Sequence, residues 1–316
     1  MARITPRWNE SCVPDLAGKR ILITGANSGI GLQTARVMAQ HDAQVILACR
    51  NEAKALEAMA GIRQHYPKAF LQFMPLDLGS QKSVREMAGL FQEQYDTLDV
   101  LINNAGVMWL PQSRTTDGYE SHLGINHLGH FTLTGLLLPV LLNTPGARIV
   151  TVSSIAHTAG DIHFEDIWLE QDYGRQKAYA QSKLANLLFA RELQRCLVEA
   201  GAPIISLAAH PGVASTNLVV PGFEHARQPV LARLMKVLTP IIAQSARKGA
   251  LPTLCAATSH EVEGGDYIGP DGFYQAFGYP GPAKSTRRSR NPEIARRLWD
   301  LSESLTGVHY DFNPRG

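Results

Sequence analysis

Residues 20–31 read RILITGANSGIG, and this stretch decides the fold. An apolar, strand-like run ends in a turn with three glycines, and a helix-like segment follows. A glycine-rich turn lets the backbone approach a pyrophosphate, and the helix N-terminus favours the negative charge. The spacing Gly25-x-x-x-Gly29-x-Gly31 differs from the commonest dinucleotide fingerprint, and it lacks the lysine of a triphosphate-binding loop. It predicts a variant dinucleotide-binding turn; the alternative is a tight turn that binds nothing.

Composition narrows the class of protein. The chain has 316 residues, 45% of them hydrophobic, and a formal charge of +2, so it can bury a core and shows no basic excess typical of nucleic-acid binding. We interpret the densest basic run, residues 287–290, as a surface loop. The four cysteines are scattered without a CxxC spacing, as expected in a reducing compartment. We found no signal-peptide-like start and no run of 18 apolar residues, so we expect a cytoplasmic protein without a membrane span.

Strand-like and helix-like runs alternate along the chain, which predicts a parallel sheet covered by helices on both faces. We expect a single-domain, doubly wound α/β (Rossmann) fold over residues 1–316, with a cofactor half at about 18–150 and a catalytic and substrate half at about 151–316. The expected strands are residues 20–24, 44–48, 70–75, 98–102, 148–153 and 203–209, with a weaker seventh near 267–268. The expected helices cover about 29–41, 51–65, 80–95, 115–142 and 176–200.

The regular alternation breaks after His210. The apolar and basic stretch 230–243 fits a helix broken near Pro240. This helix is either an ordinary packed helix or part of a substrate lid over about 213–248.

A set of motifs in a fixed order carries a family resemblance. They are the glycine turn, Asp77-Leu78, Asn103-Asn104-Ala105-Gly106, Asn126, Ser153-Ser154, Tyr179-x-x-x-Lys183 and His210-Pro211-Gly212. Across about residues 18–270 the chain resembles the short-chain dehydrogenase/reductase family. The resemblance implies a nicotinamide cofactor held by Gly25, Asn27, Ser28, Gly29, Ile30, Gly31, Asp77, Leu78, Asn104, Ala105, Gly106, Pro211 and Gly212, together with Tyr179 and Lys183.

The same resemblance assigns the catalytic roles. Hydride transfer to a carbonyl leaves an oxygen that needs a proton, and a tyrosine donates one more readily when a nearby cation stabilises its phenolate. Tyr179 is the implied proton donor, Lys183 the cation one helical turn away, and Ser154 the hydroxyl that orients the carbonyl. Asn126 is implied to hold a proton-relay water near Lys183.

Two of these assignments have neighbours that compete with them. Tyr173 and Lys177 also stand four residues apart, but Gly174 weakens a helix there, so we interpret Tyr173 as loop. Ser153 adjoins Ser154 and points to the opposite face of the strand; we expect it to be a buried, hydrogen-bonded neighbour.

The end of the second strand bears on the choice of nicotinamide. An acid there would bind the 2′-hydroxyl of NAD, but this chain has Cys49 followed by Arg50. An arginine can pair with a 2′-phosphate, and without the acid nothing repels that phosphate. We therefore expect NADP(H), although Glu52 is nearby.

Several features are similar to one branch of the family, the retinol dehydrogenase-like carbonyl reductases. They are Cys49-Arg50, the run from Asn126 to Phe131, residues 294–299 and an insertion at about 161–175 before Tyr179. This similarity implies NADPH-dependent reduction of apolar aldehydes and ketones, or oxidation of the alcohols. We expect this chain to differ from the branch's membrane members by having no N-terminal anchor. The histidines 122, 127 and 130 are implied to be structural, and we expect no metal.

Two other functions stay open at this point. One is reduction of a carbon–carbon double bond, as in the related protochlorophyllide reductases, and the other is a dinucleotide-binding sensor without turnover. The family commonly forms homodimers or homotetramers through the helices that carry Asn126 and Tyr179. The insertion adjoins one of these helices and would affect that contact.

Overall fold

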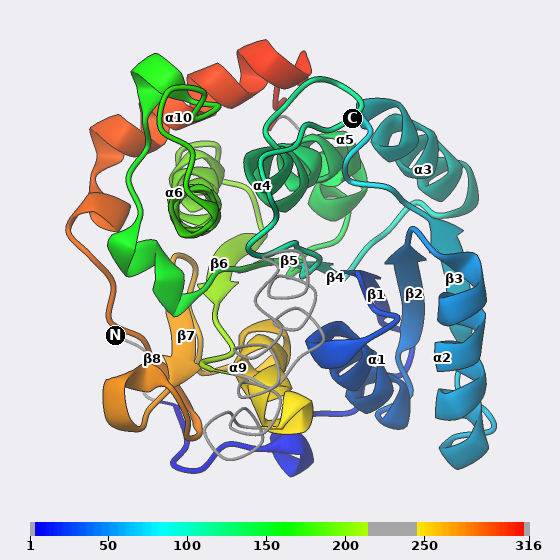
Figure 1. The fold of residues 1–316 in the computed structure, drawn as a ribbon. Helices are drawn as coiled ribbons and strands as arrows, with labels where there is room; N and C mark the ends of the chain where they lie inside the picture. The colour runs from blue at the N-terminus through cyan, green and yellow to red at the C-terminus, as the bar shows by residue number, and fades with distance from the viewer. Residues whose placement is uncertain (1–3, 214–244, 313–316) are drawn as a thin grey trace, which may run out of the picture.

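The computed structural model describes residues 4–213 and 245–312, and their strands form one eight-stranded sheet in the order β3-β2-β1-β4-β5-β6-β7-β8 (Figure 1). All neighbouring strands are parallel except β7 and β8. The strands are β1 (Arg20–Thr24), β2 (Gln44–Cys49), β3 (Leu71–Pro75), β4 (Val100–Asn103), β5 (Arg148–Val152), β6 (Ile205–Ala209), β7 (Tyr267–Pro270) and β8 (Pro280–Pro282).

Helices cover both faces of the sheet. The longer ones are α1 (Gly29–Gln40), α2 (Glu52–His65), α3 (Gln81–Gln94), α5 (Gly129–Leu142), α6 (Arg175–Glu199), α9 (Ala246–Thr258) and α10 (Pro292–Thr306). The side chains of Ile21 and Ile23 on β1 enter a core with α1, α2 and α9, whereas Leu22 enters a second core with α3, α5 and α6. This alternation follows from the two-residue period of a strand buried on both faces.

The remaining helical elements of the described chain are short. They are η1 (Glu10–Cys12), α4 (Ser121–Leu123), η2 (Gly124–Leu128), η3 (Ile155–Ala159), η4 (Phe164–Asp166), η5 (Phe273–Gln275) and η6 (Arg288–Arg290). The turn η2 is π-helical and joins α4 to α5 without a break. Single π-helical turns inside helices are frequent at functional sites, and this one carries Asn126.

The predicted single-domain, doubly wound sheet with helices on both faces is confirmed, and all seven predicted strands are present. The predicted helix over 115–142 is wrong at its start, because the first turn begins at Ser121. Residues 114–120 instead form a hairpin-like turn, closed by a bridge between Arg114 and Glu120 and turned at Gly118 with φ +85°. The predicted lid over 213–248 lies almost wholly outside the described residues.

The continuous helical segment Ser121–Leu142 is the one helix among the described residues that is long and apolar enough to cross a membrane. In the structure 78% of the apolar 18-residue window within this segment is buried inside the protein. Its length and apolar composition are therefore those of a core helix that packs between the sheet, α3 and α6.

Candidate active site

The glycine turn lies at the carboxyl end of β1 and packs tightly against its neighbours. Gly25 has φ +66°, a conformation that favours glycine. A Cβ on Gly31 would stand 2.4 Å from the Gly25 carbonyl oxygen and 2.5 Å from Asn104 Nδ2. Ser28 is the N-cap residue of α1 and makes no side-chain capping bond. The turn thus keeps backbone close to the start of a helix, as a dinucleotide cradle requires. It also leaves the Ser28 hydroxyl uncommitted to the cap.

The other predicted cofactor residues follow the ends of neighbouring strands. Arg50 follows β2, residues 77–78 follow β3, residues 104–106 follow β4, and residues 211–212 follow β6. Since these strands are parallel, all of these residues come to one edge of the sheet. The structure therefore brings together residues that are far apart in the sequence.

Thr24, the last residue of β1, connects the glycine turn to the turn after β4. Its hydroxyl oxygen accepts the backbone N–H groups of Asn104 and Ala105, each at 2.9 Å, and lies 2.9 Å from His130 Nε2. The Asn104 side chain donates back to the Thr24 carbonyl oxygen at 2.8 Å. Thr24 has no predicted role in the sequence, although a threonine directly before the glycine turn is a usable signal.

His130 extends this connection to the helix that carries Asn126. His130 Nδ1 donates to the Asn126 carbonyl oxygen at 2.9 Å. Burial lowers the pKa of His130 to about 4, so the ring is neutral and Nε2 accepts the Thr24 proton. Burial also lowers the pKa of His127 to about 3. Within residues 4–213 and 245–312, no three His, Cys, Asp or Glu side chains gather as a metal site would require.

The three side chains expected to act on the substrate lie together at the ends of β5 and in α6. The Ser154 side chain hydrogen-bonds Tyr179, which favours the phenolate, but burial is the larger effect and raises the pKa of Tyr179. Lys183 Nζ lies 5.8 Å from the centroid of the Tyr179 ring and donates to the Val152 carbonyl oxygen at 3.1 Å. Burial lowers the pKa of Lys183 to about 8. The arrangement pairs a phenol with a hydroxyl and an ammonium group whose proton is available near neutral pH.

The neighbouring residues stand as the sequence predicted. The Ser153 hydroxyl is buried and donates to the Lys183 carbonyl oxygen at 2.7 Å. Tyr173 lies in the loop directly before α6.

Both polar atoms of the Asn126 side chain bond protein partners. Its Oδ1 accepts the Val107 backbone N–H at 2.8 Å, and its Nδ2 donates to the Val107 carbonyl oxygen at 3.0 Å and to Ser182 Oγ at 2.9 Å. A Cβ on Gly106 would lie 3.1 Å from Asn126 Oδ1 and 3.5 Å from Lys183 Nζ. Asn126 therefore fixes the segment after the β4 turn beside Lys183, and its expected relay role stays a prediction.

The end of β2 presents no negative charge from Cys49. Burial raises the pKa of this thiol to about 11, so it is neutral at physiological pH. The Arg50 side chain is 76% exposed, and its Nη1 lies 4.0 Å from Oδ2 of Asp77. Asp77 Oδ1 accepts the Gly79 N–H at 2.9 Å, and Leu78 is buried. The guanidinium is thus available for an anionic group at the edge of the sheet.

The Pro211-Gly212 turn closes the opposite side of this edge. Gly212 has φ +68°, and its N–H donates to His210 Nδ1 at 3.2 Å. A Cβ on Gly212 would stand 2.3 Å from the Ala276 carbonyl oxygen. The loop at 276 therefore holds the turn in place, a contact that sequence reasoning missed because it spans about sixty residues.

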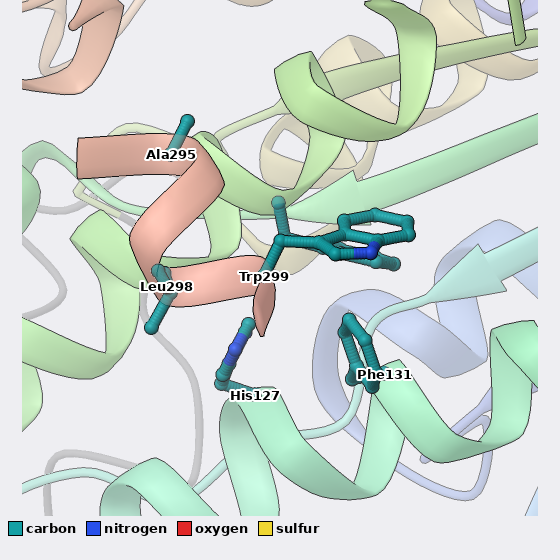
Figure 2. A pocket seen from close by; sticks show the side chains of 6 residues that line it. His127, Phe131, Ala295, Leu298 and Trp299 are labelled. Carbon is teal, nitrogen blue, oxygen red and sulfur yellow. The ribbon is translucent and has the colours of Figure 1, made fainter. Parts of the chain in front are cut away.

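A small apolar pocket lies between α10 and the helices that carry Asn126 and Tyr179, which we call the catalytic helices (Figure 2). It is lined by His127, Phe131, Phe189, Ala295, Leu298 and Trp299. It is too narrow to admit a water molecule and contains none of the catalytic residues. It is a packing gap beneath α10 and not a substrate site.

This fold and this set of residues define a dinucleotide-dependent oxidoreductase of the doubly wound class. A family model of short chain dehydrogenases matches residues 19–226. Human retinol dehydrogenase 12 is 41% identical over 298 residues, which cover 94% of this chain and 89% of that protein. The chain therefore belongs to the short-chain dehydrogenase family.

Solved structures agree on the fold. The crystal structure of an uncharacterized protein from Mycobacterium Paratuberculosis has a TM-score of 0.79 and 39% sequence identity, covering 96% of this chain and 99% of that one. A short chain dehydrogenase from Shigella flexneri, solved in complex with NADP, has a TM-score of 0.60 at 24% identity, covering 80% of this chain and 97% of that one. This second likeness concerns the fold alone.

Proposed function

We propose that this chain is an NADP(H)-dependent oxidoreductase that transfers a hydride between nicotinamide and an apolar aldehyde or ketone, or the corresponding primary or secondary alcohol. The observation that carries the proposal is the hydrogen bond between Ser154 and Tyr179 with the Lys183 ammonium behind the ring. A sensor that only binds a dinucleotide has no use for this trio.

The residues of the chain divide the work of carbonyl reduction. A nicotinamide cofactor held by the glycine turn and by the residues after β2, β3, β4 and β6 would supply the hydride to the carbonyl carbon, or accept it in the reverse direction. Ser154 and Tyr179 hold the carbonyl oxygen, and Tyr179 gives it the proton that completes the alcohol. The Lys183 charge favours the phenolate that remains, and the Ser154 hydrogen bond lowers the pKa of Tyr179 against the larger, raising effect of burial.

The proposed preference for NADP(H) rests on the end of β2. The neutral Cys49 thiol does not repel a 2′-phosphate, and the exposed Arg50 guanidinium can pair with it. The closely packed glycines at 25 and 31 fit the pyrophosphate cradle that such a cofactor needs.

The proposed substrate class follows from the relatives. The name of human retinol dehydrogenase 12 points to an apolar primary alcohol as the substrate of that protein. We extend only the class, an apolar carbonyl or alcohol, to this chain. A retinoid belongs in the substrate panel alongside medium-chain aldehydes, ketones and enones.

The test is the consumption of NADPH, and separately of NADH, with this panel. We expect turnover of aldehydes or ketones with NADPH, and a fall in kcat of roughly 100- to 10,000-fold in Tyr179→Phe with the fold intact. The Tyr66 hydroxyl donates to Gln40 far from this site. Tyr66→Phe is therefore the matched control and should keep full activity. Full activity in Tyr179→Phe would remove the proposed role. A saturated product formed from an enone would instead identify a double-bond reductase.

A further inference from the structure

A four-residue segment beside the catalytic pair is held by its backbone at both ends. At Val107 both the N–H and the carbonyl oxygen bond the Asn126 side chain. At Leu110 the N–H donates to His122 Nε2 at 3.1 Å, and the carbonyl oxygen accepts the Tyr173 hydroxyl at 2.9 Å. We call the second arrangement the Leu110 clamp; it consists of Glu120, His122 and Tyr173.

The acid–histidine half of the Leu110 clamp is fully buried. Glu120 Oε1 accepts His122 Nδ1 at 2.7 Å, and the two side chains are 2% and 0% exposed. Because His122 Nε2 accepts the Leu110 N–H, the ring proton must lie on Nδ1 and face Glu120. The Glu120 carboxylate also accepts the backbone N–H groups of His122 and Leu123. The His122 ring therefore has one tautomer and one orientation.

The tyrosine half comes from the insertion before α6. Burial raises the pKa of Tyr173, and the nearby Glu120 charge adds to this effect, so the phenol keeps its proton and remains a donor. Its oxygen is also 3.5 Å from His122 Nδ1. The clamp thus ties the insertion at 161–175 to the segment after β4, two regions about sixty residues apart.

Between the two anchored residues stand Met108 and Trp109, both half-buried. Trp109 has φ +55°, a left-handed conformation that is unfavourable for a bulky residue and persists only where the surroundings impose it. The residue before this segment, Gly106, and the clamp residue that bonds its other end, His122, lie near the catalytic pair. A Cβ on Gly106 would lie 3.5 Å from Lys183 Nζ, and the His122 ring centroid lies 6.3 Å from that of Tyr179.

We propose that Glu120, His122 and Tyr173 are positioning residues that hold Met108 and Trp109 at the edge of the Tyr179–Lys183 pair, and thereby set which apolar substrates the site prefers. The proposal rests on the proposed function, since it names the apolar wall of the same site. It also assigns a role to the insertion, which contributes Tyr173.

The test compares Tyr173→Phe with the control Tyr119→Phe. The Tyr119 hydroxyl donates to the Leu305 carbonyl oxygen at 2.7 Å, so the control removes a similar bond outside the clamp. Steady-state kinetics with NADPH would be measured for propanal and decanal. Losing one hydrogen bond should lower kcat/KM for decanal about fivefold in Tyr173→Phe, mainly through KM, with kcat and the propanal values nearly unchanged. Equal losses for both aldehydes, or the same change in Tyr119→Phe, would overturn the proposal.

Two further measurements keep the proposal separate from the proposed function. Hydrogen exchange of the peptide containing residues 107–110 should be faster in Tyr173→Phe and unchanged in Tyr119→Phe. Calorimetric binding of 1-decanol to the protein loaded with NADP should weaken about fivefold in Tyr173→Phe alone. If the parent protein reduces no carbonyl, the proposed function fails, and these two readouts still decide whether the clamp positions an apolar wall. Unchanged exchange or unchanged decanol binding would refute it.

Discussion

Lys183 brings a cation into the interior of the protein, and its environment makes this costly. The side chain is 4% exposed, and burial lowers its pKa from the usual 10.5 to about 8. Its ammonium group donates to the Val152 carbonyl oxygen, which also accepts a hydrogen bond from Asn186 Nδ2 at 3.1 Å. At the scale of one residue, the site thus keeps a charge for chemistry at the expense of stability.

Replacing this charge should stabilise the fold and abolish catalysis. Lowering the pKa to about 8 corresponds to a cost of roughly 3 kcal/mol at neutral pH. Lys183→Met removes it, and Asn186 still satisfies the Val152 oxygen. We expect a higher free energy of unfolding in urea at pH 7, together with loss of turnover.

The difference in unfolding free energy between Lys183→Met and the parent protein should depend on pH, and this dependence gives a sharper check. Between about pH 8 and 10.5 the unfolded chain carries the lysine proton and the folded chain does not, so the penalty shrinks as the pH rises. The gain in free energy of unfolding of Lys183→Met over the parent protein should be complete below pH 8 and vanish toward pH 10.5. A difference that does not vary with pH would mean that Lys183 is not destabilised by its charge.

At the scale of elements, Thr24 couples β1, the turn after β4 and α5 through one hydroxyl group. Thr24→Val keeps the shape of the side chain but leaves the N–H groups of Asn104 and Ala105 without this acceptor. We expect a loss of roughly 2 to 4 kcal/mol of stability and weaker cofactor binding. Thr24→Ser retains the hydroxyl and should restore most of both. Urea unfolding and a fluorescence titration with NADPH would measure them; parental behaviour of Thr24→Val would show that the coupling is dispensable.

The elements also show how far the sequence can be read. Strand–helix alternation and the glycine turn predict the sheet, because they follow from local periodicity. The edge strand β8 and the helix α10 went unpredicted, although Asn291, Pro292 and Gly307 are a helix N-cap, first residue and C-terminal glycine. These end signals are local, and periodicity alone did not reveal them.

The site, like the fold, has features that the sequence predicts and features that it does not. The Tyr179 and Lys183 spacing lies within one helix, so the sequence predicts that they share a face. The structure brings Ser154 to Tyr179, as the resemblance implied. The links from Thr24 to His130 and from Leu110 to Tyr173 join separate elements, and no local pattern encodes them. Their partners follow from the path of the chain in three dimensions.

At the scale of the whole molecule, α10 covers the outer side of the two catalytic helices (Figure 1). Trp299 packs against Phe131 of α5 and Phe189 of α6, with ring centroids 5.2 and 5.9 Å apart. The Tyr310 hydroxyl donates to the Phe131 carbonyl oxygen at 2.6 Å. A Cβ on Gly135 would stand 2.6 Å from Val308, so the C-terminal segment lies directly on α5.

This packing bears on the expected homodimers and homotetramers. Pairing through α5 and α6 would require the C-terminal segment to leave a face that it already fills. We expect the purified protein to show no oligomer that uses this face. Light scattering coupled to size-exclusion chromatography measures the mass, and hydrogen exchange across residues 129–142 locates any interface. An oligomer with concentration-dependent protection of α5 would contradict this expectation.

The position of α10 near the end of the chain also has a consequence for biosynthesis. Residues 129–142 and 175–199 leave the ribosome long before the segment that will cover them, since chains grow from the N-terminus at roughly 5–20 residues per second. The apolar face around Phe131 and Phe189 therefore stays uncovered until residues 292–310 have been made. For that interval the nascent chain exposes a surface that chaperones recognise. A messenger RNA truncated before codon 292 would yield an aggregation-prone polypeptide without α10 and the C-terminal segment.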